Sequence, residues 1–596
     1  MDRWPTALYD GDSLGYYLHV VSAFVNQDVG DYDQTITKLR EINPASPDPR
    51  EDKFGIRLTD RGRRYIKYTL GVPVMETPFF LLAHAWATIS PKYEANGWTY
   101  PYRLLIGFSI VCYVTLAFYL LIGILQRYFT KPVVTLVVFA LILATNLFYH
   151  TNYVIMSHGF LFFQHSLLIY WTVQFFKKSS VGLAFAIGAT VGLITLTRVP
   201  EIVVGLVPLL WGVTNKASFL ERISFFIKNY SFLICAILGF GLVFSLQISY
   251  WYYVSGQLVF NPYAGEGFNF LNPKFFKGFF HFRNGWLLYT PIMAFAIFGL
   301  LVLQRYAKAF FWPVLSFVFL QAYIHYSYYA WTFFPGLGQR PMVETYPLLS
   351  FALAAAFAFF IEKKKTSWLP LTALILCSIL NLFQTWQMRE GVIWSERHNA
   401  AFYWETFGTM KSTLNSLRAY DTKELQPDSN KLERIAVLFT EDFEDTTRIE
   451  KDKLSKTFQR SGNYAYFAPD LYHTVLENYT LKDVSPGDWL KLSIDAYMDQ
   501  SNQIFNRDGA MNLIILFHDG TGKRRKERNI KPSTYPENTT YSIWTAGIPN
   551  TWGTASFYTK VPKNAQADWA IKVLFTNPYG QLLYLDDFKL EQFKKR

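Results

Sequence analysis

The stretch YRLLIGFSIVCYVTLAFYLLIGIL, residues 102–125, decides the fold class. It is apolar throughout except for Arg103 near its start, and an apolar helix of roughly 20 residues can cross the hydrocarbon core of a bilayer. The sequence therefore predicts a polytopic α-helical membrane domain. Further apolar stretches occur at about 132–149, 153–175, 230–252, 286–303, 309–330, 342–361 and 368–385.

One apolar run, between 181 and 214, is interrupted by the sequence Arg198-Val199-Pro200-Glu201. A proline and two charges in mid-run predict a hairpin of two short helices rather than one long span. With this hairpin the sequence predicts roughly ten spans.

Composition supports a membrane protein. The chain has 596 residues, of which 51% are hydrophobic and 18% aromatic, which is too apolar for an ordinary soluble protein. The net charge of +12 lies largely in short loops that orient helices, so the membrane and not nucleic acid is the expected partner. Cys112, Cys235 and Cys377 fall inside apolar runs, which is typical of packing residues and not of disulfides or metal ligands.

The charges of the loops predict the orientation. Under the positive-inside rule, basic clusters after alternate spans mark the cytoplasmic side of a bacterial inner membrane. The opposite, extracytoplasmic side then receives residues 1–101, the tip of the hairpin at 198–201, the loop at 253–285, the loop at 331–341 and everything after 386. The basic clusters are Arg127 with Lys131, Lys177 with Lys178, the group Lys216, Arg222 and Lys228, Arg305 with Lys308, and the run Lys363, Lys364 and Lys365.

The apolar stretch at 68–89 is predicted to lie at the outer interface. It contains Pro73, Glu76, Pro78 and His84, and counting it as a span would place the basic loops outside. A true span here is the alternative. The predicted domains are an outer-face loop region at 1–101 with amphipathic and interfacial helices, a transmembrane domain at 102–385 and a linker at 386–429.

Residues 430–596 predict an extracytoplasmic β-sandwich. Alternating runs such as Trp489–Ile494 and Met511–Phe517 are separated by turn residues, which is typical of antiparallel strands. The first and last runs resemble those of jelly-roll carbohydrate-binding modules. Sugar binding and a non-binding cap are both left open. Acidic residues near both ends, Glu444 and Asp587, are candidate ligands of a structural calcium ion.

The N-terminal stretch opens with Asp10-Gly11-Asp12-Ser13-Leu14-Gly15-Tyr16-Tyr17. A carboxylate on the outer face can deprotonate an acceptor hydroxyl, so Asp12, with Asp10 as its helper, is the candidate general base. The alternative is structural, because Asp12 or Ser13 can cap the helix at 14–24.

Asp12, Tyr16 and the helix that follows resemble the first outer loop of the GT-C superfamily of membrane glycosyltransferases. The similarity is to the branch with protein O-mannosyltransferases and aminoarabinose transferases, where an Asp-Glu pair precedes such a helix. Lys67-Tyr68-Thr69-Leu70-Gly71-Val72-Pro73 looks like a variant of that branch's Lys-Pro-Pro-Leu helix. The resemblance covers about residues 8–385. Ser13 replaces the second acid, and the family's first helix is absent, so we expect the true start to lie upstream.

The resemblance implies an inverting glycosyltransferase that takes a sugar from a polyprenyl-phosphate donor to a lipid or glycan acceptor. The leaving phosphate needs positive charge. Arg340, in Gly336-Leu337-Gly338-Gln339-Arg340-Pro341, is the first candidate for it, and an interfacial arginine that reaches the headgroups is the alternative. Lys67 and Arg198 are secondary candidates, although Arg198 could pair with Glu201 instead. The family differs in its use of a divalent metal, so no cofactor is assigned.

Acceptor-side candidates are Tyr16, Glu266 and Glu344. Glu266 lies in an outer loop rich in glycine and aromatic residues, which suits a sugar. His158 and His165 lie seven residues apart on one helix face, a pattern typical of packing or of an interhelical hydrogen bond. Two other functions are kept open: a transporter or flippase for lipid-linked sugars, and a non-catalytic glycan-binding scaffold.

Overall fold

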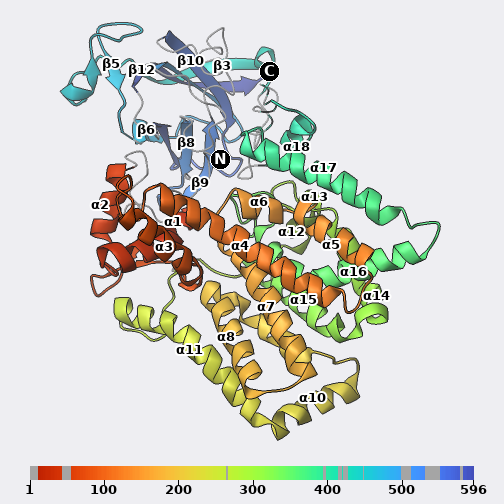
Figure 1. The fold of residues 1–596 in the computed structure, drawn as a ribbon. Helices are drawn as coiled ribbons and strands as arrows, with labels where there is room; N and C mark the ends of the chain where they lie inside the picture. Colours follow the sequence, from red (N-terminus) through yellow and green to blue (C-terminus); the bar gives the residue numbers. More distant parts are fainter. Residues whose placement is uncertain are drawn as a thin grey trace. The chain divides into compact units, whose positions relative to one another are not determined.

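The chain forms two compact units in this computed structural model, a helical unit of Met1–Trp386 and a β-rich unit of Gln387–Arg596 (Figure 1). The structure describes residues 11–42, 55–263, 266–393, 398–411, 413, 416, 419, 427–447, 449–470, 472–498, 512–530, 551–577 and 582–596.

The helical unit begins with short elements that build a small core of their own. Tyr17 and Trp98 are almost completely buried in it, and their rings pack edge to face with centroids 5.3 Å apart. The predicted interfacial stretch is a single helix, α3, which Pro78 does not break. The elements are α1 (Gly11–Val21), the π-helical turn η2 (Ser22–Asn26), α2 (Asp33–Ile42), β1 (Ile56–Leu58), β2 (Arg64–Ile66) and α3 (Gly71–Ile89).

The rest of the helical unit is apolar helix joined by short loops. Its elements are α4 (Tyr100–Leu125), α5 (Lys131–Leu143), α6 (Leu147–Asn152), α7 (Ser157–Lys177), α8 (Val181–Thr197), η3 (Val199–Gly205), α9 (Leu206–Leu210), α10 (Lys216–Lys228), α11 (Tyr230–Ser255), α12 (Phe275–Phe280), α13 (Trp286–Tyr289), α14 (Met293–Ala307), η4 (Lys308–Phe310), α15 (Phe311–Ser327), η5 (Arg340–Thr345), α16 (Tyr346–Glu362) and α17 (Leu369–Arg389).

The prediction of a polytopic helical membrane domain is confirmed, but the number of about ten spans is not. Several predicted stretches are interrupted, as at the Thr290-Pro291 step, where α13 ends before α14 begins. The run at 181–214 does divide into two short helical pieces, as predicted. Among the described residues, five helical stretches are long and apolar enough to span: Tyr100–Leu125, Tyr230–Ser255, Met293–Ser327, Arg340–Glu362 and Leu369–Arg389.

Small residues let the shorter apolar helix α8 pack closely against the long helix α11. α8 lies along α11 in Figure 1, and their contact is the most extensive between any two described elements. A Cβ on Gly188 of α8 would lie 1.8 Å from the carbonyl oxygen of Ala236, and one on Gly239 of α11 would lie 2.3 Å from that of Phe185. Glycine is therefore required on both sides of this contact, as is common between membrane helices.

The β unit is an antiparallel sandwich. One sheet has the order β10-β7-β12-β5-β4, with β3 also paired to β12, and the other has the order β6-β11-β8-β9. Ile494 of β7, Val573 of β11 and Phe517 of β8 are buried in one shared core, which shows that the two sheets pack face to face. The alternation of apolar and polar residues that predicted a sandwich is therefore confirmed.

The described elements of the β unit are α18 (Ala400–Thr406), η6 (Ser429–Lys431), β3 (Leu432–Glu441), η7 (Lys451–Lys453), β4 (Leu454–Ser455), β5 (Ala465–Phe467), β6 (Tyr472–Thr480), β7 (Trp489–Met498), β8 (Asn512–His518), β9 (Arg524–Ile530), β10 (Thr551–Lys560), β11 (Ala570–Thr576) and β12 (Leu583–Lys595).

Candidate functional site

Asp12 lies in the first turn of α1, and both of its carboxylate oxygens bind side chains from distant parts of the helical unit. Oδ1 accepts a 2.7 Å hydrogen bond from the Tyr68 hydroxyl, and Oδ2 lies 2.9 Å from a terminal guanidinium nitrogen of Arg340. The Ser13 hydroxyl donates to the carbonyl oxygen of Ile155 at 2.6 Å. These long-range contacts, and not helix capping, orient the two side chains. Asp10 lies outside the described residues.

Gly15 explains how Tyr68 reaches Asp12. The Tyr68 ring lies against the backbone of α1, where a Cβ on Gly15 would come within 2.2 Å of the ring atom Cδ2. On the same helix, Tyr16 packs its ring against Tyr68 with centroids 4.9 Å apart. Glycine at 15 is therefore a requirement of the site, because any larger side chain would displace the hydroxyl that binds Asp12.

Arg340 begins the 3-10 turn η5 at the head of the Arg340–Glu362 span. A guanidinium nitrogen also lies 2.8 Å from the Met156 sulfur, and the side chain is only 11% exposed. The loop before it needs glycine, because Gly336 and Gly338 have φ of +143° and +64°, and a Cβ on Gly336 would lie 3.0 Å from the His150 ring.

The cations around Asp12 decide its charge. Burial raises the pKa of Asp12, but the charge of Arg340, the hydrogen bond from Tyr68 and the charge of Lys67 together hold this pKa below its usual value. Burial, followed by the Asp12 charge, raises the pKa of Tyr16 to about 12. At neutral pH the site therefore holds an ionised carboxylate beside a protonated phenol, which is a hydrogen-bond donor.

A second ion pair contains two more predicted residues. Lys67 Nζ lies 3.2 Å from Glu266 Oε1, and both side chains are 9% exposed. A guanidinium nitrogen of Arg57 lies 3.7 Å from the same oxygen, and the Tyr328 hydroxyl donates to the other oxygen of Glu266. Glu266 is therefore held among basic and phenolic groups, and Lys67 belongs to the cationic surroundings of Asp12.

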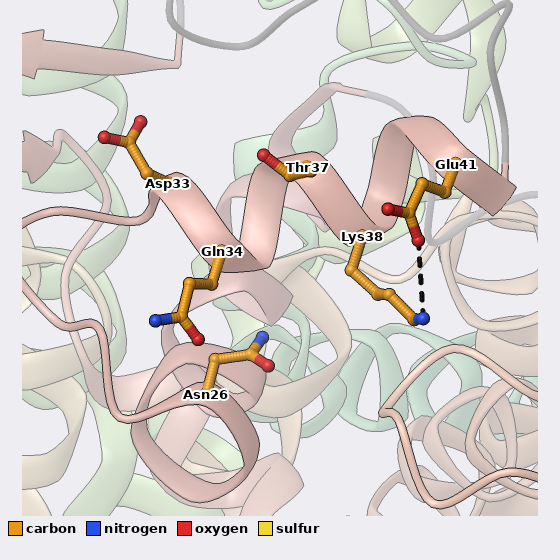
Figure 2. A pocket seen from close by; sticks show the side chains of 6 residues that line it. All are labelled: Asn26, Asp33, Gln34, Thr37, Lys38 and Glu41. Carbon is orange, nitrogen blue, oxygen red and sulfur yellow. Dashed lines mark ion pairs between the residues drawn. The ribbon is translucent and has the colours of Figure 1, made fainter.

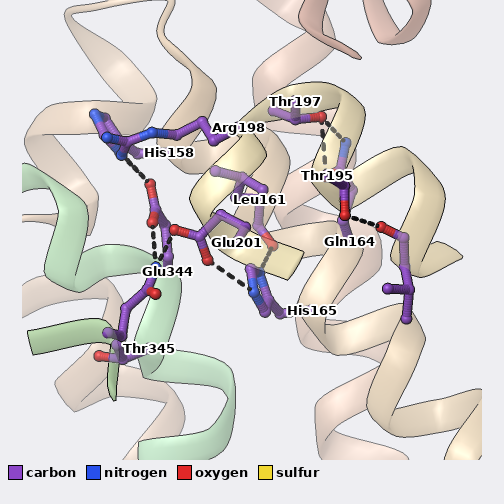
Figure 3. Close-up of polar contacts among 12 residues, drawn as sticks. His158, Leu161, Gln164, His165, Thr195, Thr197, Arg198, Glu201, Glu344 and Thr345 are labelled. Carbon is purple, nitrogen blue, oxygen red and sulfur yellow. Dashed lines mark hydrogen bonds and ion pairs between the residues drawn. The ribbon is translucent and has the colours of Figure 1, made fainter. Parts of the chain in front are cut away.

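A third cluster lies between the helices (Figure 3). A terminal nitrogen of Arg198 lies 2.7 Å from Glu344 Oε1, and His158 Nδ1 lies 2.8 Å from the same oxygen. The Gln321 amide nitrogen donates to Glu344 Oε2 at 3.0 Å and also to Glu201 Oε1. Arg198 thus pairs with Glu344, and not with Glu201, which was the pairing considered from the sequence.

The folded chain brings most predicted residues into three neighbouring pairs, Asp12 with Arg340, Lys67 with Glu266, and Arg198 with Glu344. His158 makes the interhelical contact expected of it. The predicted calcium ligands lie in the other unit. There, Glu444 accepts backbone hydrogen bonds from Asn463 at 2.6 Å and Tyr464 at 2.8 Å, so a cation would compete with these donors. The catalytic, phosphate-binding and calcium-binding roles stay predictions.

Sequence reasoning missed Tyr68, Gln321 and His325 as residues of the site, and it considered Glu201 only as a possible partner of Arg198. Tyr68 stands next to the predicted Lys67, and that position was its signal. The other residues are polar side chains within apolar runs: Glu201 shares its run with Arg198, and Gln321 and His325 lie in one helix, α15. A buried polar side chain in a membrane domain is expensive and marks a site, so their positions were informative.

A separate polar hollow of about 370 Å³ lies along α2 (Figure 2). It shares no lining residue with the three pairs. Lys38 lies 3.3 Å from Glu41 on the next turn and 3.5 Å from Glu94, which is the ordinary pairing of an exposed helix face. The hollow is lined by Asn26, Asp33, Gln34, Thr37, Lys38 and Glu41.

No protein-family model matches the chain, and no curated protein matches its sequence. Among solved structures it is similar to ArnT from Cupriavidus metallidurans bound to undecaprenyl phosphate, with 12% identity over 68% of this chain and 69% of that one, and a TM-score of 0.37. The apo state of ArnT matches at 14% identity over 68% and 67%, with the same TM-score of 0.37. Arabinosyltransferase EmbB from Mycobacterium smegmatis matches at 10% identity over 99% and 64%, with a TM-score of 0.35.

These neighbours belong to the GT-C superfamily of membrane glycosyltransferases, the family that the sequence resemblance named. With TM-scores below 0.5 the likeness is a loose one of fold. The function proposed next therefore rests on the residues of the site.

Proposed function

We propose that the protein is a membrane glycosyltransferase that moves a sugar from a polyprenyl-phosphate donor to an acceptor hydroxyl on the extracytoplasmic face. The observation that carries this proposal is the ion pair of Asp12 and Arg340, with the Tyr68 hydroxyl on the second oxygen of Asp12. A general base and a phosphate-binding guanidinium in direct contact are the two groups that such a transfer needs.

In the proposed mechanism Asp12 accepts the proton of the acceptor hydroxyl while that oxygen attacks the anomeric carbon. The bond from this carbon to the phosphate oxygen breaks on the opposite side, which inverts the configuration. Arg340 forks onto the departing phosphate and stabilises its charge. As Arg340 shares its charge with the phosphate, Asp12 becomes more basic at the step where it takes the proton.

Lys67 and Arg198 are proposed to extend the positive field around the donor phosphate. Tyr16 and Glu266 are proposed to face the acceptor, because both lie in the same neighbourhood as Asp12. Glu344 is completely buried and engaged by Arg198 and His158, so its proposed part is to position these two side chains. The loop charges support an extracytoplasmic site in a bacterial inner membrane.

The test is transfer of radiolabelled sugar from a panel of polyprenyl-phosphate donors in membranes, for wild type and Asp12→Asn. We expect the variant to lose at least about 100-fold in rate, as is usual on removal of a general base. Glu76→Gln is the matched control, because Glu76 is a buried carboxyl on α3 outside the site, and it should retain the wild-type rate. Equal rates in wild type and Asp12→Asn would remove Asp12 from the mechanism.

A transporter of lipid-linked sugars is the second candidate function. Glu201 and Glu344 are fully buried at the starts of interrupted helices, a feature of secondary transporters. Movement of labelled lipid-linked sugar across vesicles, without formation of any new glycosidic bond, would support this function against the transferase.

A further inference from the structure

Three buried side chains from different elements bring their donor atoms together: Glu201 of η3, His325 of α15 and Glu344 of η5. These atoms lie within 4.8 Å of one another. His325 Nε2 is 3.8 Å from Glu201 Oε1 and 3.9 Å from Glu344 Oε2. The two glutamates are completely buried, and His325 is 4% exposed. Two carboxylates and one imidazole thus converge on a single point.

The His325 ring lacks a hydrogen bond. Neither of its nitrogens has a hydrogen-bond partner among the described residues, although the ring is aimed at two carboxylate oxygens. Buried ring nitrogens normally find partners, because a buried polar group that makes no hydrogen bond keeps the cost of its lost hydration. A ligand between the ring and the carboxylates would give Nε2 a partner.

The outer oxygen of Glu344 is already held (Figure 3). Arg198 and His158 bind Glu344 Oε1. Glu201 Oε2 lies 3.4 Å from His165 Nε2, and neither of these two atoms has a hydrogen-bond partner among the described residues. The remaining oxygens, Glu201 Oε1 and Glu344 Oε2, face His325. Carboxylates that bind a metal are themselves oriented by surrounding hydrogen-bond donors in this way.

The negative charge of the two buried glutamates also favours a bound cation. Two buried carboxylates face each other with one guanidinium, that of Arg198, in direct contact. Uncompensated charge of this kind is very costly in a low-dielectric interior. A shared proton or a metal ion would restore the balance, but a proton shared by the two carboxylates would leave the His325 ring unsatisfied.

We propose that Glu201, His325 and Glu344 bind one divalent transition-metal ion of the zinc or manganese type. The imidazole ligand favours such a metal over magnesium or calcium, which prefer oxygen ligands only. Ligands about 2.0–2.2 Å from a metal in tetrahedral arrangement lie roughly 3.3–3.6 Å apart, so the 3.8 Å and 3.9 Å distances from His325 Nε2 to the two glutamate oxygens need to shorten only by a few tenths of an ångström.

Gln321 is the candidate fourth ligand. Its amide nitrogen donates to the two inner carboxylate oxygens, and its amide oxygen has no hydrogen-bond partner among the described residues. Turning the amide over directs that oxygen towards the same point, and such flips are common ambiguities of amide side chains. The metal would then fix Glu344, and through it Arg198 and His158. The value of fixing Arg198 rests on the proposed function, in which Arg198 extends the positive field around the donor phosphate. Binding of the metal ion itself does not depend on that function.

The test is the metal content of the purified full-length protein in detergent, loaded with Zn²⁺ or Mn²⁺ and freed of excess ion. We expect about one ion per chain in wild type, a loss of at least tenfold in affinity in His325→Ala and Glu201→Gln, and no change in Glu76→Gln. A second measurement uses Co²⁺, which absorbs visible light strongly when protein ligands hold it in a site of low symmetry. Wild type loaded with Co²⁺ should show this absorption, and the measurement needs no variant.

Wild type that binds none of the three ions would overturn the proposal and leave a carboxyl pair that shares a proton. Full binding in both ligand variants would overturn it as well, by placing the ion elsewhere. Neither result bears on Asp12→Asn, so failure of the metal site and failure of the transferase function are distinguishable.

Discussion

Two aspartates, one in each unit, show how partners decide the state of a carboxyl group. Asp12 in the helical unit binds a guanidinium and a phenol, and these with Lys67 hold its pKa below the usual value. Asp586 in the β unit accepts three backbone hydrogen bonds, from Arg460, Ser461 and Asp587. Burial nevertheless raises the pKa of Asp586 to about 6.

The difference lies in the charge of the partners. Backbone N–H groups are dipoles, and three of them do not offset the burial of Asp586, which is completely inaccessible to solvent. A full positive charge 2.9 Å from Asp12 does offset its burial. The helical unit therefore keeps an ionised carboxylate ready for chemistry, and the sandwich uses its carboxyl to fix a loop.

Of the changes that test this difference between the two units, removal of the Arg340 charge should have the largest effect, and it should appear in the rate of sugar transfer. In Arg340→Gln we expect transfer to fall by about 100- to 1,000-fold, because the group proposed to stabilise the departing phosphate is lost. Arg340→Lys keeps the positive charge but not the planar guanidinium that can bind phosphate through two nitrogens, so the loss of transfer rate should be smaller in this variant. Initial rates over a range of donor concentrations measure both. Unchanged rates in Arg340→Gln would separate Arg340 from the reaction.

The second-largest effect is expected on the acid side of the pH–rate profile, when the hydrogen bond from Tyr68 to Asp12 is removed. A base works only when ionised, and the pKa of Asp12 lies below its usual value, so the wild-type rate should stay level from pH 7.5 down to about pH 5. Tyr68→Phe removes a hydrogen bond to the charged form, which raises the pKa. The acid limb of this variant should move to higher pH. Profiles that superimpose would show that Tyr68 does not tune Asp12.

The smallest effect is expected for Asp586→Asn, on the pH dependence of the folding stability of the β unit. An aspartate in the unfolded chain ionises near pH 4, whereas Asp586 ionises at about 6 when folded. Between these values the folded state binds more protons, so stability falls as pH rises through this window and levels off above it, by at most about 3 kcal/mol. Asp586→Asn should lessen this slope.

Limited proteolysis of the β unit in the full-length protein, over a denaturant series at pH 4.5 and 7, measures this change. Transfer activity should stay within about twofold of wild type, because Asp586 belongs to the other unit. The same pH slope in wild type and Asp586→Asn would assign the pH dependence to other groups.

The sequence by itself determined the two kinds of architecture. Apolar stretches such as 102–125 must bury themselves in lipid or protein, and strict alternation as in β7 and β8 places one face of a strand in a core. The resemblance to the GT-C outer loop supplied Asp12 and Lys67 as candidates, and the predicted orientation supplied Arg198 and Arg340, which lie beside apolar runs on the predicted outer side.

Only the tertiary structure decided which of these residues meet. Asp12 and Arg340 are separated by most of the helical unit along the chain, and periodicity carries no information about such long-range pairs. The same holds for Glu201, His325 and Glu344, which lie in three elements that are far apart along the chain. The number of spans was also beyond the sequence, since packing between helices lets a segment break, as α13 and α14 do, where hydropathy alone predicts one continuous helix.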